Sequence, residues 1–205
     1  MYFFDLPLYN DDLQMMLDKH NIKALVEAER YFRDNLLFDQ MEQCYSEESR
    51  VRITWYDGDG REFVRRSSKQ GLGAKHKTHS TMIWLNGYKA IAEMQCTMIG
   101  PREILDGIQV ENQGYVRLLY KVQKENDDVW RIKGFDCIYE RDWLNVISGN
   151  SVDMEIPKED RESYKILTEH LRRLGLPVSG DLPGEDRLAS IKSLYDEAND
   201  WLFEQ

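Results

Sequence analysis

The chain has 205 residues, of which 41% are hydrophobic and 11% aromatic, so it can bury the core of one generous domain. Its formal net charge of −10 argues against nucleic acid and anionic membrane surfaces as partners, because like charges repel. No apolar run approaches the roughly 20 residues that a bilayer span needs, and residues 1–12 lack the basic start of a signal peptide. Three widely spaced cysteines, Cys44, Cys96 and Cys137, are typical of reduced thiols in a cytoplasmic protein.

Two consecutive helices are predicted at residues 10–20 and 22–37, where apolar side chains recur at helical spacing. Glu29 and Arg33 lie within the apolar arc of the second helix, four residues apart, so they can pair with each other. Such a pair is either an internal ion pair or one wall of a polar pocket. A short third helix is predicted at residues 39–44.

Long strands follow the helices. The strongest hairpin signal is Asn86-Gly87, since both residues tolerate the positive φ of a type I′ turn. Residues 57–60 are predicted to form a turn, because the other ligands of a calcium loop are missing, and residues 65–74 form a basic link. The strands are predicted at residues 50–56, 80–85, 90–98, 114–124 and 129–140. This order predicts an α+β fold, with helices packed on one face of a curved antiparallel or mixed sheet.

The composition changes near residue 150, which divides the chain into a sheet domain, 1–150, and a helical extension, 151–205. Apolar spacing predicts helices at residues 162–174 and 185–203, which would form a helical hairpin packed on the same domain or on a dimer partner. We expect a homodimer, because the second face of a large sheet needs cover. The extension could supply that cover instead, which would allow a monomer.

Several short motifs resemble one protein family. The motifs are His76, Ile83 and Gly87 in the pattern H-x6-I-x3-G, Ala90 three residues later, and Arg30-Tyr31-Phe32-Arg33 with Asp39 eight residues after Tyr31. Further likeness lies in the run WRIKGFDCIYERDWL and in the tail, residues 163–187. The chain resembles SnoaL-like domains of the nuclear transport factor 2 (NTF2)-like superfamily, in a subgroup with a C-terminal helical extension. The resemblance implies an α+β cone with a pocket for a small molecule.

The resemblance also implies candidate catalytic residues. In dehydratase-like members, an aspartate near the end of the long helix faces a histidine on the sheet, and the two perform general acid–base chemistry. His76 matches the histidine, while the acid position falls on Leu36 in an ungapped match and on Asp34 after a two-residue shift. If Leu36 holds that position, Glu29 becomes the carboxylate of the cone. Tyr31 matches a hydroxyl donor that orients a substrate oxygen, or is an ordinary aromatic at a helix–sheet contact.

Further candidates for the pocket lining come from the strands, besides Glu29 on the helix. Trp55, Trp84 and Tyr120 are strand aromatics of the kind that line such pockets or fill cores. Asp136 lies in an otherwise apolar strand, so it is either a pocket acid or an outward-facing residue at a dimer interface.

Metal and cofactor sites are not expected. His76 and His79 have no third ligand at helical or hairpin spacing, and on a regular strand they point to opposite faces. His20 and His170 lie in polar helical contexts and are expected to be in solvent. The sequence has no dinucleotide-binding glycine motif and no P-loop.

Two functions therefore stay open. The first is a cofactor-independent dehydratase or isomerase acting on a small apolar, cyclic substrate, with His76 as base or acid and Asp34 or Glu29 as its partner. The second is a non-catalytic ligand-binding or dimeric interaction module. A carboxylate within hydrogen-bond reach of His76 would favour the enzyme, whereas Leu36 packed against His76 would favour the binding module.

Overall fold

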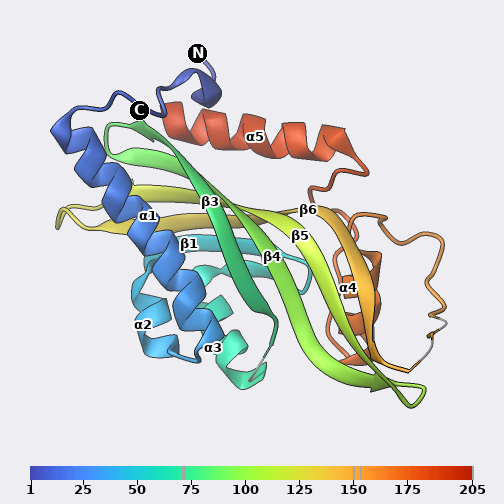
Figure 1. Ribbon diagram of the computed structural model, residues 1–205. Coiled ribbons are helices and arrows are strands. Elements are labelled where there is room, and N and C mark those ends of the chain that lie inside the picture. Colours follow the sequence, from blue (N-terminus) through green and yellow to red (C-terminus); the bar gives the residue numbers. More distant parts are fainter. Residues whose placement is uncertain (71–72, 150, 153, 205) are drawn as a thin grey trace.

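The computed structural model describes residues 1–70, 73–149, 151–152 and 154–204, and it has the predicted α+β architecture (Figure 1). One curved sheet has the strand order β2-β1-β6-β5-β4-β3. Neighbouring strands are antiparallel except β1 and β6, which are parallel, so the sheet is mixed. The strands are β1 (Tyr45–Ile53), β2 (Tyr56–Asp59), β3 (Lys75–Asn86), β4 (Lys89–Leu105), β5 (Ile108–Lys124) and β6 (Trp130–Ser148).

The first long helix is continuous, where two helices were predicted. Asp12 is its N-cap, because a side-chain oxygen of Asp12 accepts the Met15 N–H at 2.8 Å. The helix ends at Asp34, and Leu36 follows in the left-handed region with φ of 61°. The helical elements are η1 (Phe3–Asp5), α1 (Leu13–Asp34), α2 (Phe38–Gln43), α3 (Gly60–Gln70), α4 (Lys165–Arg173) and α5 (Leu188–Phe203).

Helix α3 replaces most of the link predicted at residues 65–74, of which residues 71 and 72 lie outside the described part of the chain. Asp59 begins this helix, since its side chain accepts the Glu62 N–H at 2.7 Å. Phe63 and Val64 are buried on its inner face, so the basic residues that suggested a link form the outer face of an amphipathic helix.

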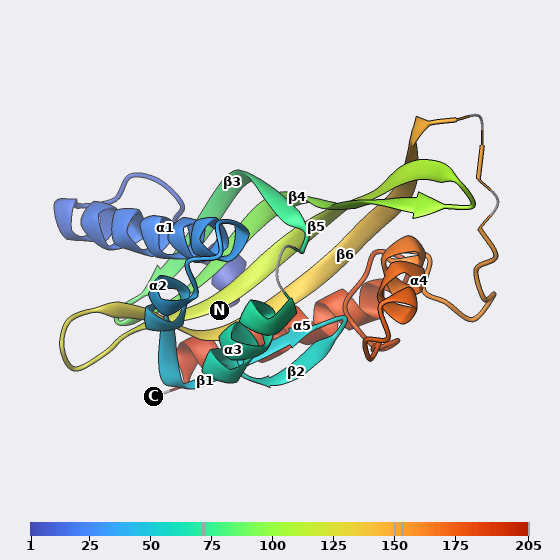
Figure 2. The ribbon, with the colours of Figure 1, turned by 90° about the horizontal axis from the view of Figure 1, so that it is seen from below.

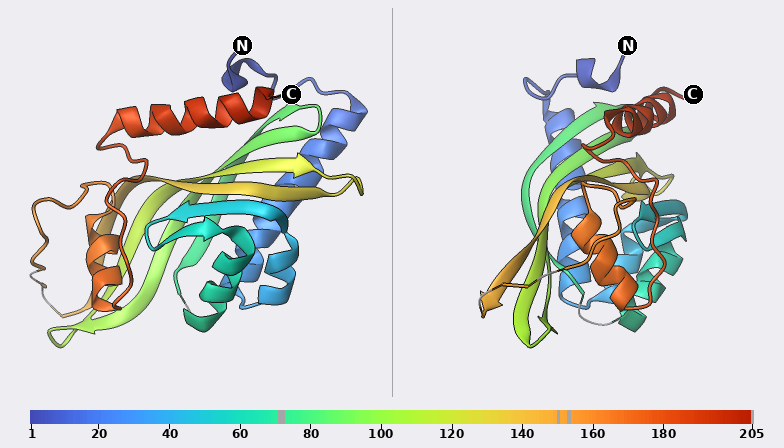
Figure 3. Two further views of the ribbon diagram at one scale, coloured as in Figure 1. Left: turned by 180° about the vertical axis from the view of Figure 1, so that it is seen from behind. Right: turned by 90° about the vertical axis from the view of Figure 1, so that its right-hand side faces the viewer.

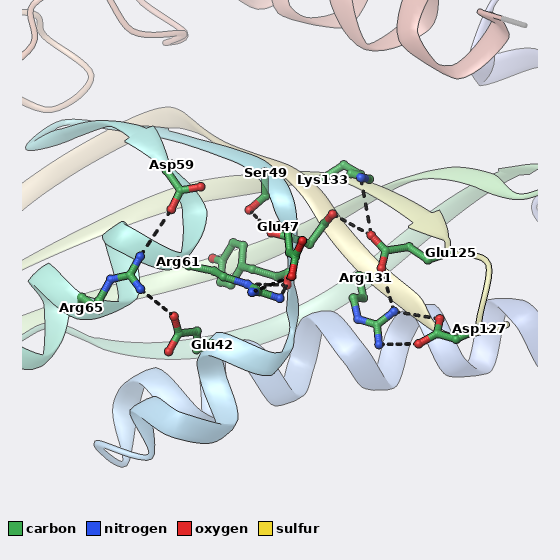
Figure 4. Close-up of polar contacts among 12 residues, drawn as sticks. Glu42, Glu47, Ser49, Asp59, Arg61, Arg65, Glu125, Asp127, Arg131 and Lys133 are labelled. Atoms are coloured by element: carbon green, nitrogen blue, oxygen red, sulfur yellow. Dashed lines mark hydrogen bonds and ion pairs between the residues drawn. The ribbon is translucent and has the colours of Figure 1, made fainter.

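Ion pairs on the surface connect these elements (Figure 4). Arg65 on α3 lies 3.1 Å from Glu42 on α2, and Arg131 on β6 lies 2.7 Å from Asp127 in the preceding turn. Arg65 is about half exposed, with 54% of its side chain accessible, and such pairs contribute about 0–1 kcal/mol each. Because these cations already face carboxylates, the network joins elements and does not offer an open charged site.

The two hairpins that share β4 use different turns. At the predicted hairpin, Asn86 pairs with Lys89, and only Gly87 of the loop has a positive φ, 60°, which is the signature of a type II′ turn. The type I′ geometry occurs instead between β4 and β5. There Asp106 and Gly107 have φ values of 50° and 79°, and this Asp-Gly signal was missed in the sequence. At Gly100-Pro101 strand β4 continues, with only an irregularity in its register against β5.

The two faces of the sheet carry separate cores. Leu118 and Tyr120 on β5 pack with side chains of α1, α3 and α4, whereas Leu119 between them packs with α5 and Phe3. Figure 2 shows α1 to α4 on the near side of the sheet with α5 behind it. Figure 3 shows α5, in red, lying across the long strands, and α4, in orange, beside their far end.

The two C-terminal helices are therefore present, but they do not form the predicted hairpin. They cover opposite faces of one sheet, because α4 buries Leu167 and Leu171 in the first core and α5 buries Leu194 and Leu202 in the second. The extension packs on its own sheet domain, and α5 supplies cover that a dimer partner was expected to give. None of the helices in the described part of the chain is both long and apolar enough to cross a bilayer.

Candidate active site

His76 and Asp34 are brought together at the place where α1 ends and β3 begins. The His76 ring nitrogen Nδ1 lies 2.7 Å from Asp34 Oδ1, and the His76 main-chain N–H donates to Asp34 Oδ2 at 2.5 Å. Both side chains are largely buried, with 12% and 13% of their area exposed. A carboxylate only accepts hydrogen bonds, so Nδ1 carries the ring proton and Nε2 of the neutral ring has a free lone pair.

The charge state of this pair follows from its surroundings. Burial lowers the pKa of His76 below its ordinary 6.5, and the nearby Arg30 and Arg33 guanidinium groups lower it further, although the bond to Asp34 opposes them. Burial alone would raise the pKa of Asp34, but hydrogen bonds and charge from His76 outweigh it and the pKa falls. At neutral pH the pair is therefore a carboxylate and a neutral imidazole, which suits a general base.

His76 lines a cavity of about 340 Å³, and Asp34 is bonded to its ring without lining the cavity itself. Side chains from α1, α3, α4 and strands β3 to β6 surround the cavity, and most of them are apolar. The apolar part of the lining includes Trp55, Phe63, Met98, Leu118, Phe135 and Leu171. A cavity of this size and lining suits a small, mostly apolar molecule that is shielded from water.

Arg33 supplies a charge to the same cavity. The residue is only 7% exposed and lines the cavity beside His76. No carboxylate of the described residues lies within ion-pair distance of its guanidinium, whose Cζ lies 5.9 Å from the centroid of the Phe38 ring. Burial and the neighbouring Arg30 lower the pKa of Arg33, but a guanidinium stays protonated. This cation can therefore face a negative charge on a bound molecule.

Arg30 also lines the cavity, but its charge is already paired with Glu29 in a buried cluster. Glu29 is fully buried and pairs with the adjacent Arg30, while its carboxylate accepts the hydroxyl groups of Tyr45 at 2.8 Å and Tyr120 at 3.2 Å. The predicted pair of Glu29 with Arg33 is thus wrong. Four partners satisfy one another, so Glu29 acts as a structural anchor and does not face the cavity.

Two polar side chains lie toward the α4 side of the cavity. Asn112 on β5 is 3% exposed, and neither atom of its amide has a hydrogen-bond partner among the described residues. His170 on α4 is 7% exposed, and its Nδ1 lies 3.1 Å from Glu103 Oε1. The expectation that His170 lies in solvent is wrong, because α4 packs on the sheet. The apolar residues Leu167, Leu171 and Leu174 share its helical face, and this spacing was the signal for burial.

Comparisons with known proteins identify the fold. A structure assigned as a scytalone dehydratase from Novosphingobium aromaticivorans shares 13% identity with a TM-score of 0.51, over 67% of this chain and 93% of its own. Hexachlorocyclohexane dehydrochlorinase LinA-type3 from Novosphingobium barchaimii shares 10% identity with a TM-score of 0.56, over 71% of this chain and 100% of its own. The fold is NTF2-like. At such identities the likeness shows the fold alone, and no protein-family model or curated protein matches the sequence.

A protein of unknown function from Mycobacterium tuberculosis shows the same NTF2-like fold, with 15% identity and a TM-score of 0.54 over 80% of this chain and 99% of its own. Because proteins of different function share this fold, the chemistry must be argued from the residues of the cavity.

Within this NTF2-like fold, Asp34 is the carboxylate that meets His76. Leu36 lies beyond the end of α1, has a left-handed backbone conformation and is 41% exposed. Tyr31 is 61% exposed on the outer side of α1, so it does not reach the cavity. His79 is exposed and its Nε2 lies 2.8 Å from Thr97 Oγ1.

The remaining predicted residues divide between the two faces of the sheet. Trp55 lines the cavity, and Tyr120 lies below it, stacked on Phe135 with ring centroids 4.9 Å apart. Trp84 and Asp136 lie on the opposite face of the sheet, so they do not line the pocket as predicted. Trp84 packs against Phe3 in the second core, and Asp136 pairs with Arg52 at 2.6 Å.

In the described part of the chain, no three side chains of His, Cys, Asp or Glu lie close enough together to hold a metal ion. The side chains at this site offer a neutral imidazole, the carboxylate that orients it, and a buried cation.

Proposed function

We propose that this protein is a cofactor-independent enzyme that removes a proton from a small, largely apolar ring substrate and then eliminates water from it. The observation that carries the proposal is that His76, bonded to Asp34, lines a mostly apolar cavity. A binding module needs no oriented, neutral imidazole at its pocket wall, whereas proton abstraction does.

In the proposed step, Nε2 of His76 takes a proton from a ring carbon next to a carbonyl group. The electrons of the broken C–H bond form a C=C bond, and the C–O bond of a hydroxyl on the neighbouring carbon breaks. The leaving oxygen departs with its electron pair and receives the proton from the His76 imidazolium, which gives water and restores the neutral ring. Asp34 stabilises the imidazolium in between, as a carboxylate bonded to Nδ1–H does in other catalytic histidines.

Arg33 has a separate task in this scheme. As the proton leaves, negative charge develops on the carbonyl oxygen of the substrate, and a fixed cation in a water-poor cavity stabilises that charge. A single donor of this kind is worth roughly 10²–10³ in rate, and a positioned base roughly 10²–10⁴. Both effects draw on groups that are already in place, so no cofactor is needed.

The names of two fold neighbours support the choice of elimination. One is assigned as a scytalone dehydratase and another is a hexachlorocyclohexane dehydrochlorinase. Isomerisation uses the same first step, with the proton returned to a different carbon. We therefore take proton abstraction as the core of the proposal and elimination as its favoured continuation.

The test is deuterium exchange. Cyclic ketones with a hydroxyl group on the carbon two bonds from the carbonyl are incubated with the protein in D₂O. Deuterium uptake next to the carbonyl is followed by mass spectrometry, and formation of the conjugated product by ultraviolet absorbance. We expect both signals to fall by about 10²–10⁴ in His76→Gln and to stay within about twofold in His79→Gln, a matched control on the same strand.

Two results would count against the proposal. If His76→Gln and His79→Gln lose activity equally, the effect is structural and His76 is not the base. If ring ketones bind but never exchange deuterium in the native protein, the cavity belongs to a ligand-binding module.

A further inference from the structure

The α4 side of the cavity carries a second histidine–carboxylate pair that the proposed base does not use. His170 comes from the C-terminal extension and Glu103 from the far part of β4, and the 3.1 Å contact between them joins residues 67 positions apart. A second contact holds α4 in place, since Asp142 Oδ2 on β6 accepts the Leu167 N–H at 2.8 Å. Glu103 therefore orients the His170 ring while Asp142 fixes the helix that carries it, and Nε2 is the ring nitrogen left for the cavity.

Asn112 adds an independent sign of a ligand at this end. Its amide is buried, yet neither the oxygen nor the nitrogen has a partner among the described residues. A buried amide without partners is costly and uncommon, so it needs an explanation. The opposing Gly100 leaves it room, because a Cβ at that glycine would lie 2.0 Å from Asn112 Oδ1. A hydroxyl group of a bound molecule can donate to the amide oxygen and accept from the amide nitrogen, whereas a carbonyl group can only accept from the nitrogen.

The register of the sheet separates this polar end from His76. His76 pairs with Met98, and Met98 pairs with Gly114, so Asn112 lies two strands away and two residues along the same face. Two strand spacings are about 10 Å. Met98, Val116 and Leu118 line the cavity together with these polar groups. The cavity thus has a base at one end, a polar group at the other and an apolar stretch between them.

We propose that Asn112 and His170 bind an oxygen substituent on the edge of the substrate remote from His76. The substrate class is then a ring compound of one or two rings with an oxygen on each of two opposite edges. The assignment of the reacting edge depends on the proposed function, whereas the recognition of the remote oxygen does not. Because His170 lies on α4, the C-terminal extension takes part in substrate choice as well as covering the cavity.

The experiment compares two probes that differ in one group, 2-naphthol and 2-methylnaphthalene. Their affinities for the native protein are measured by calorimetric titration, and we expect 2-naphthol to bind about tenfold more tightly, as one or two net hydrogen bonds would give. The preference should disappear in Asn112→Leu/His170→Leu. It should persist in His76→Gln and in His20→Leu, a control histidine that is exposed on α1.

The outcomes separate this inference from the proposed function. Equal affinities for the two probes in the native protein would overturn the inference, as would a preference that depends on His76 but not on Asn112 and His170. A protein that never exchanges deuterium but keeps the preference would refute the proposed base and leave the polar end intact. If the double variant does not fold, as judged by circular dichroism, the single variant Asn112→Leu gives the same comparison.

Discussion

Replacing Asp34 by Asn should change which nitrogen of His76 carries the proton. In the native chain both oxygens of Asp34 accept, one from the main-chain N–H and one from ring Nδ1. An amide has only one acceptor, and the main-chain N–H can only donate. The amide oxygen therefore turns to the main chain, and the amide NH₂ turns to Nδ1, which must then accept. The ring proton moves to Nε2, the nitrogen that would take the substrate proton.

The size of the effect follows from burial. The two side chains are 12% and 13% exposed, so water screens their interaction little. A hydrogen bond to a charged group is worth about 1.5–3 kcal/mol and a neutral one about 1 kcal/mol. We expect Asp34→Asn to lower the free energy of unfolding by about 1–3 kcal/mol, which is a fall in Tm of roughly 2–4 °C per kcal/mol for a chain of this length. Turnover should fall by about 10²–10⁴, because the base is present in the wrong tautomer.

Nitrogen-15 correlation spectra of the histidine rings report the tautomer directly. At neutral pH the native His76 should show a protonated Nδ1 and an unprotonated Nε2, and Asp34→Asn should reverse this pattern. Asp39→Asn, an exposed aspartate on α2, is the matched control and should change neither spectrum nor turnover. An unprotonated Nε2 in Asp34→Asn, or turnover within threefold of native, would refute the orienting role of Asp34.

Four further predictions concern pH and stability. Because the pKa of His76 is lowered, kcat/KM should be constant at neutral pH and decline only below pH 6.5. The unfolding free energy should also decrease as pH falls below 6.5, since the histidine of the unfolded chain binds the proton more readily. A decline that begins above pH 6.5 would contradict both expectations. Glu29→Gln leaves the Arg30 charge buried and should cost about 3–5 kcal/mol in urea unfolding, whereas a loss under 1 kcal/mol would show that the cluster is not an anchor. Asn112→Leu removes an unsatisfied amide with little change of shape and should raise the unfolding free energy by about 1–3 kcal/mol, so a fall in Tm would contradict the missing partners. Burial raises the pKa of Asp142 from 3.8 to about 6, so ionisation of this carboxyl group makes the native protein less stable as pH rises from 3.8 through 6. The unfolding free energy of Asp142→Asn should therefore exceed that of the native protein by an amount that grows over this pH range. A difference that does not change with pH would be evidence against the raised pKa.

Much of the architecture could be read from local pattern. Apolar spacing predicted the helical region of α1, although as two helices, together with the long strands and the two C-terminal helices, because a helix or strand is marked by which neighbours along the chain share a face. The same rules failed where two local signals competed. The basic outer face of α3 hid its buried residues Phe63 and Val64, and the Asp106-Gly107 turn was overlooked in favour of Asn86-Gly87.

The sequence by itself determined the chemistry-bearing side chains and the elements that carry them, His76 on a strand and Asp34 near a helix end. Only the tertiary structure decided which of these residues meet. The pairing of His76 with Asp34 spans 42 residues, and that of His170 with Glu103 spans 67. Such contacts depend on where α1 ends, on the register of the sheet and on which face α4 and α5 cover. Those choices are made by long-range packing, which local periodicity does not encode.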